Sequence, residues 1–126
     1  SDLVEILLAC AENRLGSIQP PRFSPDVALT VVMAANGYPG TPENGGRIDG
    51  VPAAETTGAK VFHAGTKLGI DGVLTASGGR VLNVTAKSAT VREAQERAYA
   101  AVDAIQFPTG FCRRDIGWRE IAREEG

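Results

Sequence analysis

The sequence is poor in the residues from which most metal and redox centres are built. Its 126 residues include two cysteines, one histidine and one methionine. Cys10 and Cys112 lie far apart and belong to no CxxC or Cys/His cluster, which argues against a metal site and fits a reducing compartment. We expect Cys10 to be a free, buried thiol. Because His63 is the only histidine, a multi-histidine metal site is excluded.

The sequence also lacks an excess of one charge and any long apolar run. Thirteen basic and fifteen acidic residues are mixed along the chain and give a net charge of −2, so no broad field attracts nucleic acid or an anionic membrane. No apolar run approaches the roughly 20 residues that span a bilayer, and the first residues lack the basic start of a signal peptide. With 43% hydrophobic residues, the composition predicts one soluble domain in the cytoplasm, without nucleic-acid or membrane partners.

The first residues predict a short amphipathic helix over residues 3–15. Asp2 and Glu5 have capping-box spacing, and Gly16 supplies a stop. The apolar residues that follow the 3.6-residue period are Leu3, Ile6, Leu7 and Cys10. The next stretch, SIQPPRFSPD over residues 17–26, contains three prolines and predicts an extended linker. Because no preceding element is present to pack on this helix, we expect the chain to be part of a longer protein.

The stretch from Val27 to Ala35, VALTVVMAA, predicts a central strand that is covered on both faces, because it is β-branched and almost wholly apolar. Residues 36–50 are rich in glycine and proline and predict a long loop. Long ordered loops in compact domains are often functional.

Residues 60–68, KVFHAGTKL, read as one extended strand. Alternation then places Phe62, Ala64 and Leu68 on a core face, and Val61, His63, Gly65 and Lys67 on the other face. On that second face His63 and Lys67 would lie about 13 Å apart, with Gly65 leaving room for a polar ligand. The alternative is that Gly65 marks a bulge or the strand end and that Lys67 points to water.

The second half of the sequence predicts strands followed by helices. Residues 72–86 contain two β-rich runs joined by Gly78 and Gly79, which predicts a tight antiparallel hairpin. Thr90 and Glu93 form a capping box for a helix that reaches Ile105. Its apolar face comprises Ala94, Ala98, Val102 and Ile105. A last helical turn or two is expected over residues 116–124. The order of elements indicates an α+β fold on an antiparallel sheet.

The segment FCRRDIG, residues 111–117, is a second candidate site. Arg113 and Arg114 could bind a phosphate or carboxylate in bidentate fashion. Alternatively, either arginine pairs with Asp115. The spacing around Gly65 and Lys67 does not fit a P-loop, and no Ser/His/Asp or Cys/His arrangement is recognisable.

Five motifs in order carry a family resemblance: GYPG after the apolar strand, VFHAGTK, GRVLNVTA, EAQERAYAAVDAI and FCRRDIGWR. Together they resemble the C-terminal part of the phosphoribosylamine–glycine ligase family, within the ATP-grasp superfamily. The resemblance implies an antiparallel-sheet domain of the hairpin-rich hybrid-motif type with flanking helices. Residues 1–16 would then be the last helix of an ATP-grasp domain, residues 17–26 a linker, and residues 27–126 a substrate-side domain.

The resemblance also implies an ATP-dependent, ADP-forming ligase of purine synthesis. Such an enzyme joins glycine to 5-phosphoribosylamine through an enzyme-bound glycyl phosphate, using ATP and Mg²⁺ or Mn²⁺. The residues that hold ATP and metal are expected in the N-terminal and ATP-grasp domains of the same polypeptide. This chain would contain no cofactor site and no catalytic residue, and alone it would be inactive.

By analogy with related enzymes of the purine pathway, one lysine and one arginine of this domain hold the ribose phosphate. The matching positions are Lys67 and either Arg113 or Arg114. His63 would orient the lysine or the sugar, and the loop that contains Gly37, Tyr38 and Gly40 would border the cleft. One alternative is a non-catalytic module that packs against the grasp domain. The expected hairpin tip, Ser77 to Arg80, contains no lysine, which argues against a carrier role.

Overall fold

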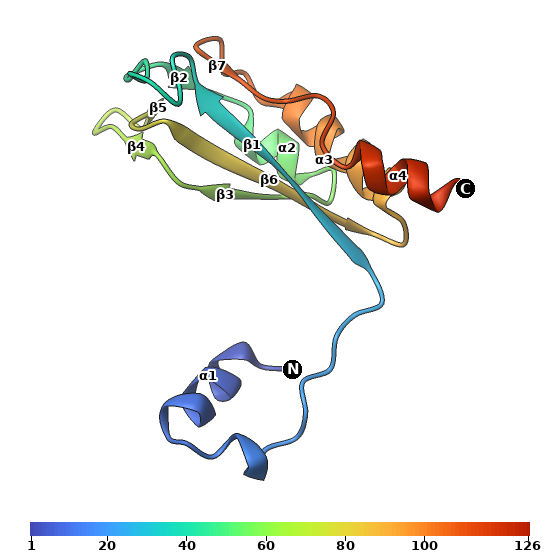
Figure 1. Cartoon of the computed structure of the whole chain (residues 1–126). Coiled ribbons are helices and arrows are strands. Elements are labelled where there is room, and N and C mark those ends of the chain that lie inside the picture. The colour runs from blue at the N-terminus through green and yellow to red at the C-terminus, as the bar shows by residue number, and fades with distance from the viewer.

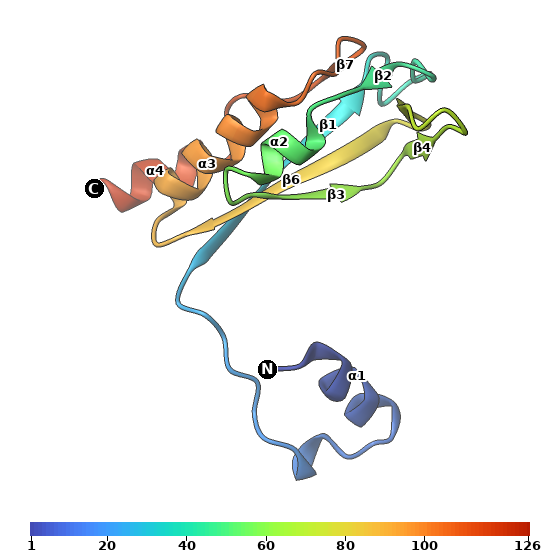
Figure 2. The ribbon, with the colours of Figure 1, turned by 180° about the vertical axis from the view of Figure 1, so that it is seen from behind.

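The computed structural model describes all 126 residues and shows a small N-terminal segment set apart from the main body. Figure 1 shows helix α1 (Leu3–Ala11) and the 3₁₀ turn η1 (Leu15–Ser17) joined to the rest by a chain without regular structure. The same separation is visible from behind in Figure 2. The predicted linker over residues 17–26 is therefore extended over most of its length.

Helix α1 is shorter than predicted and lacks a packing partner. The Asp2 side chain caps it by accepting a hydrogen bond from Val4 N at 2.8 Å. The helix ends at Ala11 and not at residue 15. Its only buried residue is Ala9, whereas four large apolar side chains are between 49% and 72% exposed: Leu3, Val4, Leu7 and Leu8. Cys10 is also exposed, so the expectation of a buried thiol is wrong, because nothing in the main body covers this helix.

The main body contains two antiparallel sheets and three helices, which confirms the α+β prediction. The larger sheet has the order β3 (Lys60–His63), β6 (Arg80–Ser88), β1 (Val27–Ala35) and β7 (Gly110–Phe111). The smaller sheet has the order β2 (Arg47–Ile48), β5 (Leu74–Ala76) and β4 (Thr66–Leu68). The helices are α2 (Val51–Glu55), α3 (Val91–Ala104) and α4 (Trp118–Glu124). None of the helices is both long and apolar enough to cross a membrane.

Strand β1 has the predicted bounds and a central position, but it is covered on one face only. Leu29, Val31 and Met33 are buried, while the alternate residues Thr30 and Val32 are exposed. Helices α2 and α3 lie behind the larger sheet in Figure 1 and in front of it in Figure 2, so both cover the same face. The expectation of a strand buried on both sides is therefore wrong for this chain.

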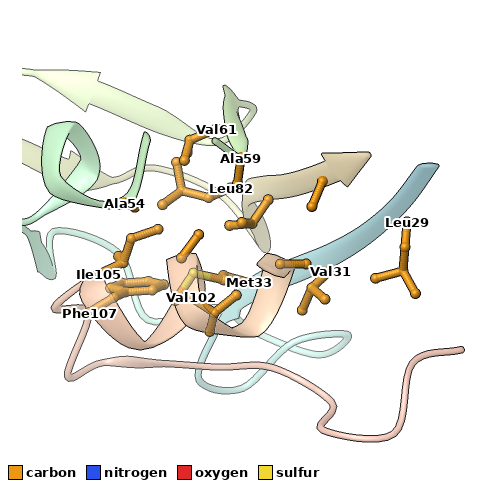
Figure 3. Close-up of a cluster of buried hydrophobic side chains, with 14 of the residues drawn as sticks. Leu29, Val31, Met33, Ala54, Ala59, Val61, Leu82, Val102, Ile105 and Phe107 are labelled. Atoms are coloured by element: carbon orange, nitrogen blue, oxygen red, sulfur yellow. The ribbon is translucent and has the colours of Figure 1, made fainter. Parts of the chain in front are cut away.

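The core lies between the larger sheet and α3 (Figure 3). Its largest fully buried side chains are Leu82, Val31, Val81 and Val84; full burial of such a side chain stabilises a fold by about 1.5–3 kcal/mol. The predicted apolar face is confirmed, since Ala94, Ala98 and Val102 of α3 are buried, as is Ile105, which lies one residue beyond the end of the helix. The small alanines allow the helix to approach the sheet closely.

The segment 60–68 is not one strand. It breaks after His63, so β3 belongs to the larger sheet and β4 to the smaller one. Val61 is buried and Phe62 is 51% exposed, so the predicted core face is reversed. Gly65 donates a backbone hydrogen bond to Arg80 O at 2.9 Å, and a Cβ on Gly65 would lie 2.8 Å from that oxygen. The space beside Gly65 is thus filled by backbone, and the alternative of a strand end is correct.

The hairpin predicted at Gly78 and Gly79 is also wrong. Strand β5 pairs with β2 and β4, whereas β6 pairs with β1 and β3, so the chain passes from one sheet to the other at these glycines. The actual hairpin joins β4 to β5. In its turn the Asp71 side chain accepts a hydrogen bond from Val73 N at 3.1 Å, and Gly72 has a φ of +77°.

The remaining predictions concern the loop and the C-terminal helices. Thr90 caps α3 by accepting a hydrogen bond from Glu93 N at 3.2 Å, as its spacing predicted. Helix α4 confirms the expected final helical turns. The loop over residues 36–50 contains β2, and α2 directly after it was not predicted. Both elements are very short, so they leave little periodic signal in the sequence.

Candidate functional site on the open face of the sheet

One face of the larger sheet has no helix over it and carries the candidate site; we call it the open face. It is formed by the alternate residues of three strands, and the register aligns Phe62 of β3, Asn83 of β6 and Val32 of β1. Thr30 and Thr85 lie on the same face and share a hydrogen bond of 2.8 Å. This face is mixed in character, with exposed aromatic, hydroxyl and amide groups.

Two hollows lie side by side on the open face. The first hollow is lined by Val32, Tyr38, Ala64, Gly79, Arg80 and Asn83. The second hollow, of about 310 Å³, is more apolar. It shares Val32, Tyr38 and Arg80 with the first and adds Thr30, Ala34, Phe111, Cys112, Arg113 and Ile116. Tyr38 and Arg80 therefore stand where the two hollows meet.

The glycine-rich loop positions Tyr38 at this junction. A Cβ on Gly79 would collide with the Tyr38 ring, so glycine at that position allows the ring to lie against the backbone. Gly37 has a φ of +91°, a conformation that favours glycine. The loop is held to the body because Asn36 N donates a hydrogen bond to Thr109 O at 2.9 Å. Of the predicted loop residues, only Tyr38 lines the hollows. Gly37 precedes it, and a Cβ on Gly40 would lie 3.1 Å from Gly37 O.

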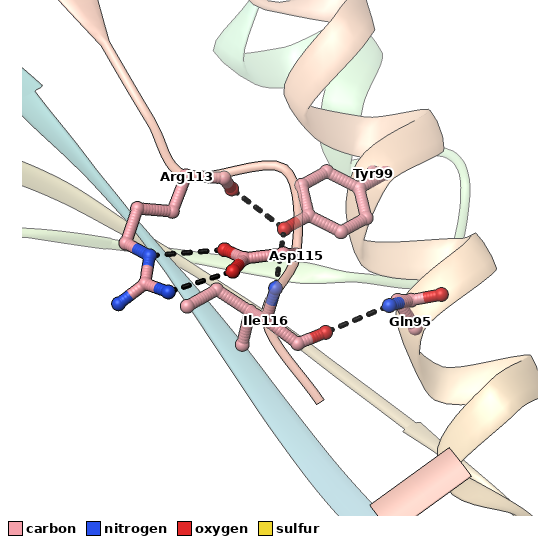
Figure 4. Close-up of polar contacts among 5 residues, drawn as sticks. All are labelled: Gln95, Tyr99, Arg113, Asp115 and Ile116. Carbon is pink, nitrogen blue, oxygen red and sulfur yellow. Dashed lines mark hydrogen bonds and ion pairs between the residues drawn. The ribbon is translucent and has the colours of Figure 1, made fainter. Parts of the chain in front are cut away.

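A network of hydrogen bonds holds residues 113–117, the RRDIG segment, on α3 (Figure 4). The Tyr99 hydroxyl donates a hydrogen bond to Arg113 O at 2.6 Å and accepts one from Ile116 N at 3.2 Å. Gln95 Nε2 donates to Ile116 O at 2.7 Å. Burial raises the pKa of the Tyr99 phenol, so the neutral, hydrogen-bonding form is favoured.

The two arginines of this segment lie in different surroundings. The Arg113 guanidinium binds Asp115 through both oxygens, at 2.9 and 2.7 Å, and this hydrogen bonding lowers the pKa of Asp115. Arg113 also lines the second hollow. Arg114 instead donates to Asp103 of α3 at 2.7 Å and lies 5.4 Å from the centre of the Tyr99 ring. Arg113 is therefore directed toward the open face and Arg114 toward the helical layer.

The structure does not bring Lys67 and Arg113 into the same hollow. Lys67 is exposed on β4 and lines neither hollow, and it forms no ion pair. The β3 edge and β7 lie on opposite sides of β6 and β1. His63 contacts Thr66, with 3.1 Å between Nδ1 and Oγ1, so its side chain is directed to the start of β4.

Sequence reasoning missed two residues of the open face, Arg80 and Phe111. Arg80 was considered only as part of a hairpin tip, and the position of Phe111 beside the sheet depends on the pairing of β7 with β1.

The structure contains no group of three or more His, Cys, Asp or Glu side chains arranged to hold a metal. The polar groups that converge at the hollows are suited to binding an anion.

The fold and the open face define this chain as an α+β domain with one side of its sheet available to a ligand or a neighbouring domain. The family model described as "Phosphoribosylglycinamide synthetase, C domain" matches residues 28–119, and the chain belongs to this family.

Similar proteins agree with this assignment. The phosphoribosylamine–glycine ligase of Phenylobacterium zucineum is 54% identical over 98% of this chain, and that of Escherichia coli K12 is 51% identical over 99%. In both comparisons the chain spans 29% of the relative's length. A crystal structure of phosphoribosylamine–glycine ligase from Thermotoga maritima is 33% identical and matches 88% of this chain, with a TM-score of 0.68, over 27% of its own length.

Proposed function

We propose that this chain is the C-terminal part of a phosphoribosylamine–glycine ligase. The enzyme joins glycine to 5-phosphoribosylamine, with ATP converted to ADP and phosphate, in purine biosynthesis. The match of residues 28–119 to the C-domain model supports this proposal, as do relatives of that name that are at least 50% identical over nearly the whole chain.

Within that enzyme, the open face forms the wall of the active site that holds the substrate phosphate. The observation that carries this role is the pair of hollows that meet at Tyr38 and Arg80, with Arg113 beside one of them. A planar guanidinium matches the geometry of a phosphate group. Arg113 is the better candidate of the two neighbouring arginines, because Arg114 is directed to α3.

Lys67 belongs to the same proposal as a cation at the β4 end of the wall, with His63 positioning the strand through Thr66. The exposed Lys67 ammonium forms no ion pair and is free to bind an anion. The loop with Gly37, Tyr38 and Gly40 borders the cleft.

ATP and Mg²⁺ or Mn²⁺ are held by the N-terminal and ATP-grasp domains, which belong to the same polypeptide. The 126-residue chain by itself is inactive, and the enzyme acts in the cytoplasm. We assign residues 1–16 to the grasp domain, residues 17–26 to a linker and residues 27–126 to the substrate-side domain.

A second role, domain packing, is favoured by the exposed apolar face of α1. Leu3, Val4 and Leu7 are each more than half exposed, which is unusual for side chains of this size on one short helix. We assign this face to contact with the grasp domain.

The test compares Lys67→Ala and Arg113→Ala with Arg114→Ala in the complete polypeptide. Loss of one charged hydrogen bond costs about 1.5–3 kcal/mol, so the first two variants should raise KM for phosphoribosylamine and leave KM for ATP unchanged. Arg114→Ala is the control, since Arg114 faces the helical layer. Unchanged KM values for phosphoribosylamine in both test variants would contradict the assigned roles.

A further inference from the structure

The ion pair between Arg113 and Asp115 leaves one edge of the guanidinium unused. The Asp115 carboxylate accepts hydrogen bonds from Arg113 Nε at 2.9 Å and from Nη2 at 2.7 Å. A guanidinium carries about five N–H groups in one fixed plane, so the N–H groups on Nη1 and the second one on Nη2 have no protein acceptor. Figure 4 shows the third nitrogen of Arg113 directed away from Asp115. The pair therefore occupies one side of the guanidinium and leaves its outer edge open to an anion.

The backbone on both sides of Asp115 is fixed by helix α3. The Tyr99 hydroxyl donates a hydrogen bond to Arg113 O at 2.6 Å and accepts one from Ile116 N at 3.2 Å. Gln95 Nε2 donates to Ile116 O at 2.7 Å. Both side chains of the ion pair thus start from backbone that is held in place. Because the guanidinium is also held at its far end, Arg113 has lost much of its freedom before any ligand binds.

The next arginine forms the same kind of pair in a different place. Arg114 Nη1 donates to Asp103 at 2.7 Å, and this pair is directed toward the helical layer. Arg113, in contrast, lines the second hollow of the open face. Only the Arg113–Asp115 pair therefore lies where a ligand on the open face can reach the guanidinium, and the Arg114–Asp103 pair provides an internal comparison.

We propose that Asp115 is a positioning residue, which holds the Arg113 guanidinium so that its free outer edge faces a ligand anion at the second hollow. The assignment rests on the proposed function, in which Arg113 contacts the substrate phosphate, and it names the group that presents Arg113 to that phosphate. Asp115 itself does not contact the ligand. The ion pair and the ligand contact, which the sequence suggests as alternatives, thus occur together on one guanidinium.

Asp115 affects a bound anion in two opposite ways. Its negative charge repels a phosphate, so removal of the charge alone would tighten binding. Its hydrogen bonds preorganise Arg113, and without them a mobile side chain must be ordered when the ligand binds. The repulsion is screened by solvent, since the side chains of Arg113 and Asp115 are 69% and 50% exposed. We therefore expect the loss of preorganisation to prevail and the removal of the carboxylate to weaken binding.

The experiment measures steady-state kinetics of the complete polypeptide with Asp115→Asn, Asp115→Glu and Asp103→Asn. Asp115→Asn should raise KM for phosphoribosylamine about threefold to tenfold, as expected when one long side chain must be immobilised on binding. KM for ATP and kcat should stay unchanged. Asp115→Glu keeps both carboxylate oxygens and should restore most of the affinity. Asp103→Asn is the matched control, because it alters the pair of Arg114, and its KM for phosphoribosylamine should equal that of wild type.

A double variant separates positioning from a general effect on the structure. If Asp115 acts through Arg113, adding Asp115→Asn to Arg113→Ala should raise KM for phosphoribosylamine no further. The assignment is overturned by an equal further rise in the double variant, or by an unchanged or lowered KM in Asp115→Asn alone. If Asp115→Asn fails to fold, judged by its thermal melt, Asp115→Ser decides by the same criteria.

A binding measurement separates this proposal from the proposed function. Calorimetric titration of ribose 5-phosphate into the complete polypeptide should show binding that is weakened by Asp115→Asn and not by Asp103→Asn. A polypeptide without ligase activity that showed this pattern would refute the function and keep the positioning role. Equal binding by wild type and Asp115→Asn in an active ligase would refute the positioning role and keep the function.

Discussion

Tyr99→Phe tests whether the RRDIG segment is held on α3 by a single hydroxyl. The substitution keeps the ring and removes one oxygen. That oxygen donates to Arg113 O at 2.6 Å and accepts from Ile116 N at 3.2 Å. Without it, the partly buried Ile116 N–H has no acceptor, while Gln95 still holds the Ile116 carbonyl.

The expected loss follows from these two hydrogen bonds. Each contributes about 0.5–1.5 kcal/mol net, so the free energy of unfolding should fall by about 1–3 kcal/mol. The ring itself stays packed, so no cavity contributes to the loss. Tyr38→Phe is the matched control: the Tyr38 hydroxyl forms no hydrogen bond, and its removal should change stability by less than about 0.5 kcal/mol.

Guanidinium unfolding followed by the fluorescence of Trp118 measures both variants. Trp118 is the only tryptophan and begins α4, directly after the RRDIG segment. We expect a lower midpoint with an unchanged slope for Tyr99→Phe. Equal midpoints for Tyr99→Phe and Tyr38→Phe would refute the conclusion that this hydroxyl holds the segment.

Two further predictions concern Gly65 and alkaline pH. Gly65→Ala places a Cβ 2.8 Å from Arg80 O and 3.1 Å from backbone atoms of Ser77 and Gly78. These are backbone atoms, so they cannot shift without distorting the strands. The free energy of unfolding of this variant, measured by the same denaturation, should fall by about 1–3 kcal/mol, and a wild-type midpoint would contradict the crossing of the two sheets at this point. Because burial raises the pKa of Tyr99 in the folded chain, the stability that it contributes is complete below the unfolded value near 10 and is lost as pH rises toward the folded pKa. Wild type should therefore lose stability above about pH 10 more steeply than Tyr99→Phe, and parallel pH profiles would show that Tyr99 does not titrate differently in the folded chain.

The elements that were predicted correctly are those with a strong local pattern. Strand β1 is a nine-residue run that is almost wholly apolar, and α3 has both an N-cap and an unbroken apolar face. Such signals are contained in neighbouring residues, so no knowledge of the fold is needed. The exposure of Val32 and Phe62 could not be predicted in this way, because it depends on which face the helices cover.

Glycine was the main source of error. Gly65, Gly78 and Gly79 were interpreted as a ligand gap and a hairpin turn, but they serve the close crossing between two sheets. Each of these glycines allows another backbone segment or an aromatic ring to approach closely. The sequence alone does not show which segment that is. The turn signal Asp71-Gly72 was present in the sequence and identifies the true hairpin.

The candidate site also combines contacts that the sequence predicts with contacts that depend on the fold. The Arg113–Asp115 pair was visible as an alternative at a spacing of two residues, whereas the pairing of Arg114 with Asp103 requires α3 to lie against the segment. Arg80 became a candidate only when the structure placed it where the two hollows meet.

The most direct test of the proposed function is ATP turnover by the complete polypeptide that contains this chain. With glycine and freshly generated phosphoribosylamine, we predict ADP formation that requires both substrates, and no ADP formation by the 126-residue chain alone. A complete polypeptide that forms no ADP in the presence of both substrates, or an isolated chain that does, would contradict the assignment of this domain to a phosphoribosylamine–glycine ligase.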